Sequence, residues 1–176
     1  MRLVTCTFAA LLLAPAPRQE RPKPEKEHAW LQPLAGEWTT ETSFPGEDGK
    51  EPTRTKGSAT GRMIGDFWAV METRGEAGGV AFTGVMTIGY DPEKKNYVGT
   101  WIDSMNARLW HYLGTVDGST LALMAEGPNH AQPDKQAKYR DALEVKAKDH
   151  LVLTSSMEVD GKWTPYLAVE FKRKAK

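Results

Sequence analysis

The stretch Gly36-Glu37-Trp38 marks the point at which the pattern of the sequence changes. Before it, apolar residues within residues 25–34 recur at roughly helical spacing, and Pro33 ends this helix early or restricts it to a turn. After it, the chain consists of short segments in which polar and apolar side chains alternate, the period of a β-strand. The stretch therefore predicts the start of a first strand that follows a short helix.

Ten alternating segments follow one another, at residues 36–44, 55–64, 66–76, 80–90, 97–103, 108–116, 120–126, 137–147, 151–159 and 163–172. Between them stand turn residues such as the Asp-Gly pairs 117–118 and 160–161, which suit the positive φ angles of tight hairpins. A long meander usually closes, because closure removes exposed sheet edges. We therefore expect an all-β protein: a single closed antiparallel up-and-down barrel of about ten strands, wide enough for an internal cavity.

Several motifs resemble known barrel proteins. The Gly36-x-Trp38 opening resembles that of lipocalin-like barrels, in which the tryptophan plugs the closed end and an arginine from the end of the barrel packs on it; the resemblance implies this cation–π role for Arg173. Further motifs are His28-Ala-Trp-Leu, Gly89-Tyr-Asp-Pro92, Tyr97-Val-Gly-Thr-Trp101, Tyr139-Arg-Asp141 and Gly161-Lys-Trp163. In this order they are similar to the bacterial domain of unknown function 1579 family over residues 26–174. The resemblance implies a lipocalin-like barrel and no particular activity.

Length and charge exclude several classes of partner. A chain of 176 residues is expected to form one domain whose core needs no disulfide or metal. Lys+Arg and Asp+Glu both number 23, so the formal net charge is zero. No basic excess is present to drive nucleic-acid binding or attraction to an anionic membrane surface.

The N-terminus predicts export. Residues 1–16 read as a signal peptide, with Arg2, a short apolar run and a small-residue site at Ala14-Pro15-Ala16. The run is shorter than the roughly 20 apolar residues that span a bilayer. Residues 17–27 read as a linker rich in proline and charge, and residues 28–174 as the barrel domain. Removal of the signal would also remove Cys6, the single cysteine, so we expect a thiol-free protein in the periplasm or outside the cell.

The strand pattern also predicts which side chains point inward. In segment 80–90 the larger and more apolar alternate set contains Met86, so this set is assigned to the interior, and the next hairpin places Tyr97 and Trp101 on the same face. If a turn follows at residues 104–107, the opposed pairs are Asp103 with Arg108, Trp101 with Trp110, and Gly99 with Tyr112. Opposed residues share a face, so we expect an aromatic interior with an Asp103–Arg108 pair at one mouth. A one-residue slip would reverse the assignment.

Asp141 is predicted to be a carboxylate among apolar neighbours. In segment 137–147, Tyr139 and Asp141 share the inward set, while Lys138 and Arg140 belong to the set that faces water. A buried charge is costly unless it is paired or hydrogen-bonded. Asp141 is therefore either a polar anchor for a ligand or an acid with a raised pKa, or a mouth carboxylate satisfied by Tyr139, an arginine or water.

The opposite face of segments 97–103 and 108–116 is also apolar, with Val98, Leu113 and, among them, His111. A strand pair that is apolar on both faces needs a cover on the outside. The helix at residues 25–34 is one candidate, and a homodimer through this outer face is the other.

No cofactor, metal site or catalytic residue is assigned. The chain has no Gly-x-Ser-x-Gly, no phosphate-binding glycine loop and no His-Glu-x-x-His, and no two histidines have the spacing of zinc ligands. The haem-binding barrels called nitrobindins look similar in outline and need a histidine that lines the cavity; none is found in the last strands.

The leading hypothesis is a non-enzymatic barrel that holds a small apolar or amphipathic ligand. The predicted site consists of Trp101, Trp110, Tyr112, Met86 and Tyr139, with Asp103, Arg108 and Asp141 orienting a polar end. One alternative is an enzyme that uses Asp141 or Asp103 as acid or base; another is a filled barrel that serves as an interaction module. The volume and lining of the interior separate these hypotheses.

Overall fold

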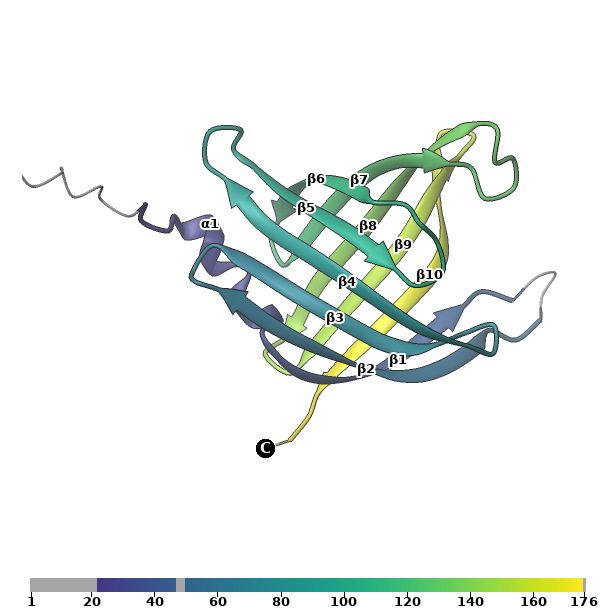
Figure 1. The fold of residues 1–176 in the computed structure, drawn as a ribbon, viewed down its shortest axis with the longest axis horizontal. Coiled ribbons are helices and arrows are strands. Elements are labelled where there is room, and N and C mark those ends of the chain that lie inside the picture. Colours follow the sequence, from purple (N-terminus) through teal and green to yellow (C-terminus); the bar gives the residue numbers. More distant parts are fainter. Residues whose placement is uncertain (1–21, 47–49, 176) are drawn as a thin grey trace, which may run out of the picture.

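A computed structural model describes residues 22–46 and 50–175, so the predicted signal peptide, Cys6 and residues 17–21 of the predicted linker lie outside the described residues. The described chain forms a closed antiparallel barrel in which each strand pairs with the next and β1 pairs with β10 (Figure 1). The predicted fold is confirmed.

Ten strands and two short helical turns make up the domain. In chain order they are α1 (Lys26–Ala29), the 3₁₀-turn η1 (Gln32–Leu34), β1 (Gly36–Phe44), β2 (Thr53–Ile64), β3 (Trp68–Ala77), β4 (Val80–Asp91), β5 (Asn96–Asp103), β6 (Trp110–Asp117), β7 (Thr120–Pro128), β8 (Gln136–Ala147), β9 (His150–Val159) and β10 (Lys162–Arg173). Pro33 lies in η1, so the expected helix is limited to single turns. The helical part begins at Lys26, inside the range predicted as linker.

One end of the barrel is closed by side chains around Trp38. Leu31, Leu34 and Trp38 are at most 1 % exposed. The indole Nε1 of Trp38 donates to the backbone oxygen of Leu34 at 3.2 Å. The guanidinium of Arg173 lies 4.1 Å from the centre of the Trp38 ring, so the predicted cation–π contact is confirmed.

Arg173 also links the end of β10 to the segment before β1 and to the turn before β9. Its guanidinium donates to the backbone oxygens of Ala35 at 2.7 Å, Pro33 at 2.9 Å and Lys148 at 2.8 Å. Gly36 makes room for it: a Cβ at Gly36 would lie 2.0 Å from Nη1 of Arg173, and its φ of +139° is one that other residues rarely adopt. The glycine of the opening motif is therefore required by both space and backbone conformation.

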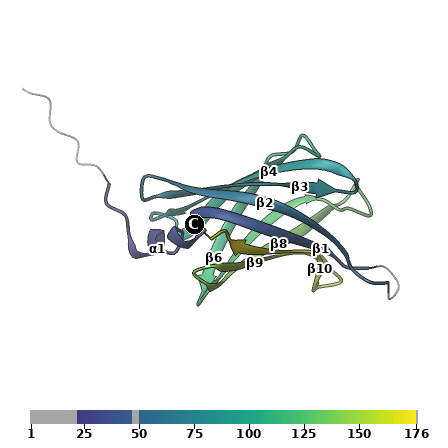
Figure 2. The ribbon, with the colours of Figure 1, turned by 90° about the horizontal axis from the view of Figure 1, so that it is seen from below.

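The helical segment caps this end of the barrel. His28 is buried with its ring edge-on to Phe67 and Tyr90, and the hydroxyl of Tyr97 donates to the backbone oxygen of Glu27 at 2.8 Å. Burial is the main cause that raises the pKa of Tyr97 to about 12. Figure 2 shows the segment beside the C-terminal end of the chain.

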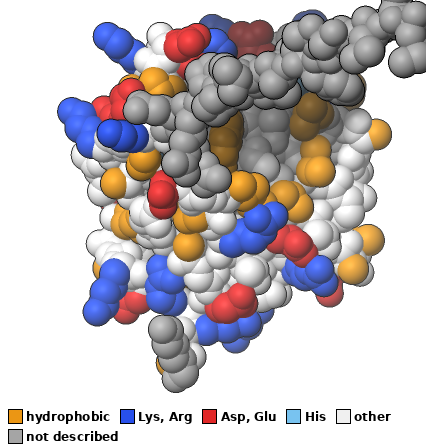
Figure 3. Space-filling model, turned by 60° about the vertical axis from the view of Figure 1, so that its left-hand side comes forward, with side chains coloured by type: hydrophobic (Ala, Val, Ile, Leu, Met, Phe, Trp, Pro, Cys, Tyr) orange, Lys and Arg blue, Asp and Glu red, His pale blue; other side chains and the backbone are white. Residues whose placement is uncertain are grey.

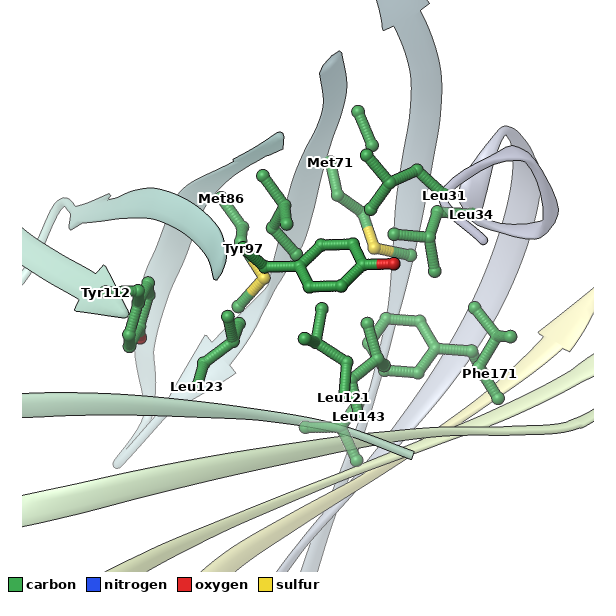
Figure 4. Close-up of a cluster of buried hydrophobic side chains, with 14 of the residues drawn as sticks. Leu31, Leu34, Met71, Met86, Tyr97, Tyr112, Leu121, Leu123, Leu143 and Phe171 are labelled. Atoms are coloured by element: carbon green, nitrogen blue, oxygen red, sulfur yellow. The ribbon is translucent and has the colours of Figure 1, made fainter. Parts of the chain in front are cut away.

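The expectation that this helix covers the outer face of β5 and β6 is wrong. The apolar residues Leu31 and Leu34 sit on the turns that follow α1, and they insert into the barrel end instead. Figure 4 shows both side chains close to the hydroxyl end of Tyr97. The outer face keeps exposed apolar side chains at Ile102 and Leu113.

The core fills the half of the barrel next to this plug. Buried side chains from most strands meet there, including Met71, Met86, Leu121, Leu123, Leu143 and Phe171 (Figure 4). Burial of each such side chain stabilises the fold by about 1.5–3 kcal/mol relative to its exposure. Several of these core side chains, Met71 and Met86 among them, also border a cavity.

The outer surface carries charges of both signs, which are interspersed on the face shown in Figure 3. Among the residues that the structure describes, no helix has the length and apolar character needed to cross a bilayer.

Candidate functional site

The interior holds a cavity of about 300 Å³ at the end away from Trp38. Its deep part is lined by core side chains such as Met71 and Met86, and its rim by the ends of strands and by the loop after β7. The lining includes many aromatic residues: Phe44, Phe82, Trp101, Trp110, Tyr112, Tyr139, Tyr166 and Phe171. The barrel is therefore hollow at one end and packed at the other.

The predicted residues converge on this cavity, with one exception. The expected register is present, because Trp101 pairs with Trp110 and Gly99 with Tyr112. The residues that line the cavity as predicted are Met86, Trp101, Asp103, Trp110, Tyr112, Tyr139 and Asp141. Arg108 is exposed in the turn before β6 and does not line it.

The predicted Asp103–Arg108 ion pair is wrong. The carboxylate of Asp103 accepts hydrogen bonds from the backbone N–H of Met105 at 2.8 Å, from the amide of Asn106 and from the indole of Trp101 at 2.9 Å. These donors satisfy the carboxylate within its own turn, the usual local behaviour of aspartate. Arg108 instead lies over the Trp110 ring, with its Cζ 5.6 Å from the ring centre.

Two tryptophans shape the mouth because glycines face them. A Cβ at Gly84 would lie 2.2 Å from Cη2 of Trp101, and one at Gly127 would lie 2.3 Å from Cζ3 of Trp110. Each indole therefore occupies the space that a side chain on the neighbouring strand would fill. Trp101 also stacks on Phe82, with ring centres 6.1 Å apart.

Asp141 is the carboxylate in the deep part of the cavity. The hydroxyl of Tyr112 donates to its Oδ2 at 2.5 Å, and Ser155 is its register partner on β9. Burial raises the pKa of the Asp141 carboxyl, although hydrogen bonds from Ser155 and Tyr112 act in the opposite direction. Within residues 22–46 and 50–175, no lysine, arginine or histidine forms a salt bridge with it.

Of the partners considered for Asp141, neither Tyr139 nor an arginine bonds to it in the described chain. Tyr139 instead donates its hydroxyl proton to the backbone oxygen of Pro128. Tyr112, which lies two strands away on β6, takes the place expected for Tyr139. Asp141 is thus hydrogen-bonded by neutral donors and left without a counter-charge.

The tyrosines near Asp141 remain neutral donors. Burial is the largest cause that raises the pKa of Tyr112 and of Tyr166 far above the usual value, and the nearby Asp141 charge raises both further. A phenol in this position keeps its proton at neutral pH. The deep end of the site therefore presents one acid and several hydroxyl groups.

Tyr166 and His130 line the cavity and were missed by sequence reasoning. Tyr166 lies at the bulge between Pro165 and Leu167, which turns it inward; Pro165 within a strand was an available signal, because proline is found at bulges and edges. His130 lies in the loop after β7, with its ring 5.1 Å from the rings of both Tyr139 and Tyr166. No periodicity points a loop residue into a cavity.

A second hollow of about 580 Å³ lies on the outside of the barrel and is lined mainly by β5, β6 and β7. The β6–β7 ladder ends at the pair Leu113 and Met124, although both strands continue towards the open end. Tyr112 and Ala125 line this hollow and the inner cavity alike. The outer hollow is more open to solvent and has fewer convergent polar groups, so we take the inner cavity as the candidate site.

Metal binding has no obvious centre in the described residues: among them, no three His, Cys, Asp or Glu side chains gather closely enough to hold an ion. Both carboxylates proposed for an enzyme line the cavity, but Asp103 is occupied by its own turn. Asp141 with Tyr112 is the remaining pair that meets the geometric condition for acid–base chemistry.

Comparisons with solved structures find barrels of the same kind. The crystal structure of Rv2717c from M. tuberculosis matches with a TM-score of 0.57 and 12% identity, over 86% of this chain and 99% of that one. The S-type phycobiliprotein lyase CPES from Guillardia theta matches with a TM-score of 0.53 and 12% identity, over 88% and 99%. A redesigned β-barrel, mFAP0, bound to DFHBI, matches with a TM-score of 0.45 and 12% identity, over 81% and 100%.

At this identity the likeness to Rv2717c and to the lyase shows the fold alone. No curated protein sequence matches this chain. The family model described as "Protein of unknown function (DUF1579)" matches residues 23–173, which include both helical turns and all ten strands. The chain therefore belongs to the DUF1579 family.

Proposed function

We propose that this protein holds a small, mainly apolar ligand inside the barrel, with the polar end of the ligand at Asp141. The cavity carries this proposal. Its volume of about 300 Å³ lies at the lower end of the range for small-molecule sites, and its lining is apolar with a few convergent polar groups. A barrel that served only as a scaffold for protein contacts would gain stability from filling this space.

The residues divide into two roles. Trp101, Trp110 and Met86 contact the apolar body of the ligand near the mouth and the wall. Asp141 and Tyr112 meet its polar end in the deep part of the cavity. Arg108, which lies outside the cavity, has no part in the proposed site.

The first test is native mass spectrometry of the protein purified from its own host. A bound small molecule is expected, released under denaturing conditions. A protein that always appears bare would speak against the proposal, and a titration then decides it. 1-Octanol, monitored by calorimetry and by tryptophan emission, is expected to bind with one equivalent.

Two tryptophan variants locate the binding. Trp110→Ala, at the cavity mouth, is expected to weaken octanol binding at least fivefold. Trp163→Ala is the matched control, because Trp163 lies on the outer side of β10 with Arg140 over its ring at 4.9 Å. Equal effects of the two variants would contradict a site inside the barrel.

An enzyme that uses Asp141 as acid or base is the second candidate. The observation that favours it is the hydrogen-bonded Tyr112–Asp141 pair in a cavity, where burial raises the pKa of the carboxyl. Incubation of the recovered ligand with fresh protein separates the two candidates. A binding protein returns the compound unchanged, whereas an enzyme converts it and Asp141→Asn stops the conversion.

We further propose that the protein is exported and that a second copy covers the outer face of β5 and β6. Export is tested by the N-terminal residue of the mature chain, expected after cleavage near Ala16.

Support for the dimer is the exposure of Leu113 at 56% and Ile102 at 49% on that face. Light scattering at micromolar concentration is expected to give twice the monomer mass.

A further inference from the structure

The negative and positive charges that line the cavity lie at different depths. Asp141 lies in its deep part without a cationic partner in the described chain. The basic residues that border the cavity, Lys56 and Arg74, are exposed at the rim, and Arg74 is paired with Glu72 at 2.6 Å. The positive charges are thus screened by water, while the negative charge of an ionised Asp141 is not.

The groups that surround Asp141 supply hydrogen bonds but no positive charge. Tyr112 donates from β6, Ser155 lies opposite on β9, and Tyr166 approaches from β10. All three are neutral hydroxyl groups. Neutral donors stabilise a carboxylate only in part, because a buried charge needs a charged partner to offset the loss of its hydration.

Aromatic rings line the same cavity, between its mouth and Asp141. The rings of Trp110 and Tyr139 lie 5.1 Å apart, and those of Tyr139 and Tyr166 lie 6.3 Å apart, in edge-to-face contacts. Aromatic faces attract cations, and the attraction is stronger where water is excluded. A carboxylate at the base of an aromatic cavity therefore favours an ammonium group over a carboxylate or a phosphate.

We propose that the polar end of the ligand is a basic amine, whose ammonium group pairs with Asp141 while its apolar body lies against the aromatic wall. This inference rests on the proposed function, because it names the chemical class of the ligand in the same cavity. The amine supplies the counter-charge that the chain lacks. An anionic amphiphile, such as a fatty acid, would bring a second negative charge to Asp141 and bind more weakly.

Three compounds of equal chain length test the charge preference: octylamine, 1-octanol and octanoate, titrated by calorimetry at pH 7. Octylamine is expected to bind at least tenfold more tightly than octanol, and octanoate more weakly than either. Equal affinities of octylamine and octanol would overturn the inference. If none of the three binds, the proposed function fails together with it, so the two failures are distinguishable.

Variants locate the preference at one residue. Asp141→Asn is expected to lose the tenfold preference for octylamine and to keep its affinity for octanol, because the cavity shape is preserved. Glu76→Gln is the matched control: Glu76 is an exposed carboxylate at the rim of the same cavity, and its loss is expected to leave the preference unchanged. A preference that survives Asp141→Asn would overturn the assignment.

A measurement on the unaltered protein guards against a variant that fails to fold. As pH falls, Asp141 takes up a proton, so octylamine binding is expected to weaken while octanol binding stays constant. His130, which lies in the loop near Tyr139 and Tyr166, is a histidine that lines the same cavity. His130→Gln is therefore run in parallel. The inference fails if the pH dependence disappears with His130→Gln, or if octanol shows the same dependence.

Discussion

The two ends of the barrel use the same residue types for opposite purposes. At the plugged end, Trp38 is fully buried, its indole N–H is bonded, and the guanidinium of Arg173 reaches three backbone oxygens. At the open end, Trp101 and Trp110 border a cavity, and Asp141 has no counter-charge in the described chain. The bonded indole and guanidinium at one end favour a structural role; the carboxylate without a counter-charge beside a cavity at the other favours a binding role.

The largest difference between the ends should come from their tryptophans. Trp38→Ala removes a fully buried side chain that has no water to replace it, so we expect a loss of about 3–5 kcal/mol in the free energy of unfolding. Trp110→Ala removes a partly exposed side chain at the mouth and should cost less than half of that. Urea unfolding followed by circular dichroism measures both. Similar losses would contradict the division between a structural and a binding end.

The arginines provide the second contrast. Arg173→Met keeps much of the length of the side chain but leaves three backbone oxygens without this donor and removes the cation–π contact. The expected loss in the free energy of unfolding is about 2 kcal/mol. Arg108→Met, in an exposed turn, should change it by less than about 0.5 kcal/mol. The comparison fails if Arg108→Met is the more damaging variant.

Much of this contrast was readable from the sequence, because a β-strand has a period of two. The alternation placed Trp101 opposite Trp110 and pointed Tyr139 and Asp141 inward, and the structure has this register. The family resemblance added the Trp38–Arg173 contact. Pattern therefore predicts a side chain well wherever it lies within a regular ladder.

The wrong or missing predictions concern residues at which the regular pairing of strands ends. Asp103 is the last residue of β5, so its carboxylate bonds to the following turn instead of to Arg108. His130 is in a loop, and Tyr166 is at a bulge that shifts the register of β10. The position of the helical segment also depends on packing at the barrel end, which no local pattern encodes.

Asp141 should behave in the opposite way to the residues of the plug, because its removal should stabilise the protein. Burial raises the pKa of its carboxyl in the folded state. The folded protein therefore keeps a proton over a pH range in which the unfolded chain has lost it, so stability falls as pH rises from the unfolded pKa to the folded one. Above this range, Asp141→Asn should add about 1 kcal/mol to the free energy of unfolding.

The control for Asp141→Asn is the same measurement at pH 3.5, where the carboxyl is protonated in the folded protein and largely so in the unfolded chain. There the variant and the unaltered protein should have nearly equal stability. A variant that is less stable at both pH values would show that the carboxylate is structural. In that case the charge of Asp141 would be compensated within the fold, as the charge of Arg173 is at the plugged end.

The smallest expected effect on stability is that of a substitution on the side wall, between the two ends of the barrel. Leu113 on β6 is 56% exposed, so Leu113→Lys should change the free energy of unfolding of a monomer by less than about 0.5 kcal/mol. If a second copy covers this face, the variant should instead halve the mass seen by light scattering, because a lysine buried in an apolar contact lacks a partner. Octanol binding should be unchanged, since Leu113 lines the outer hollow and not the inner cavity. A variant that lowers both the mass and the octanol affinity would show that the outer face is coupled to the site through Tyr112 and Ala125, which line both hollows. The binding region would then extend through the barrel wall.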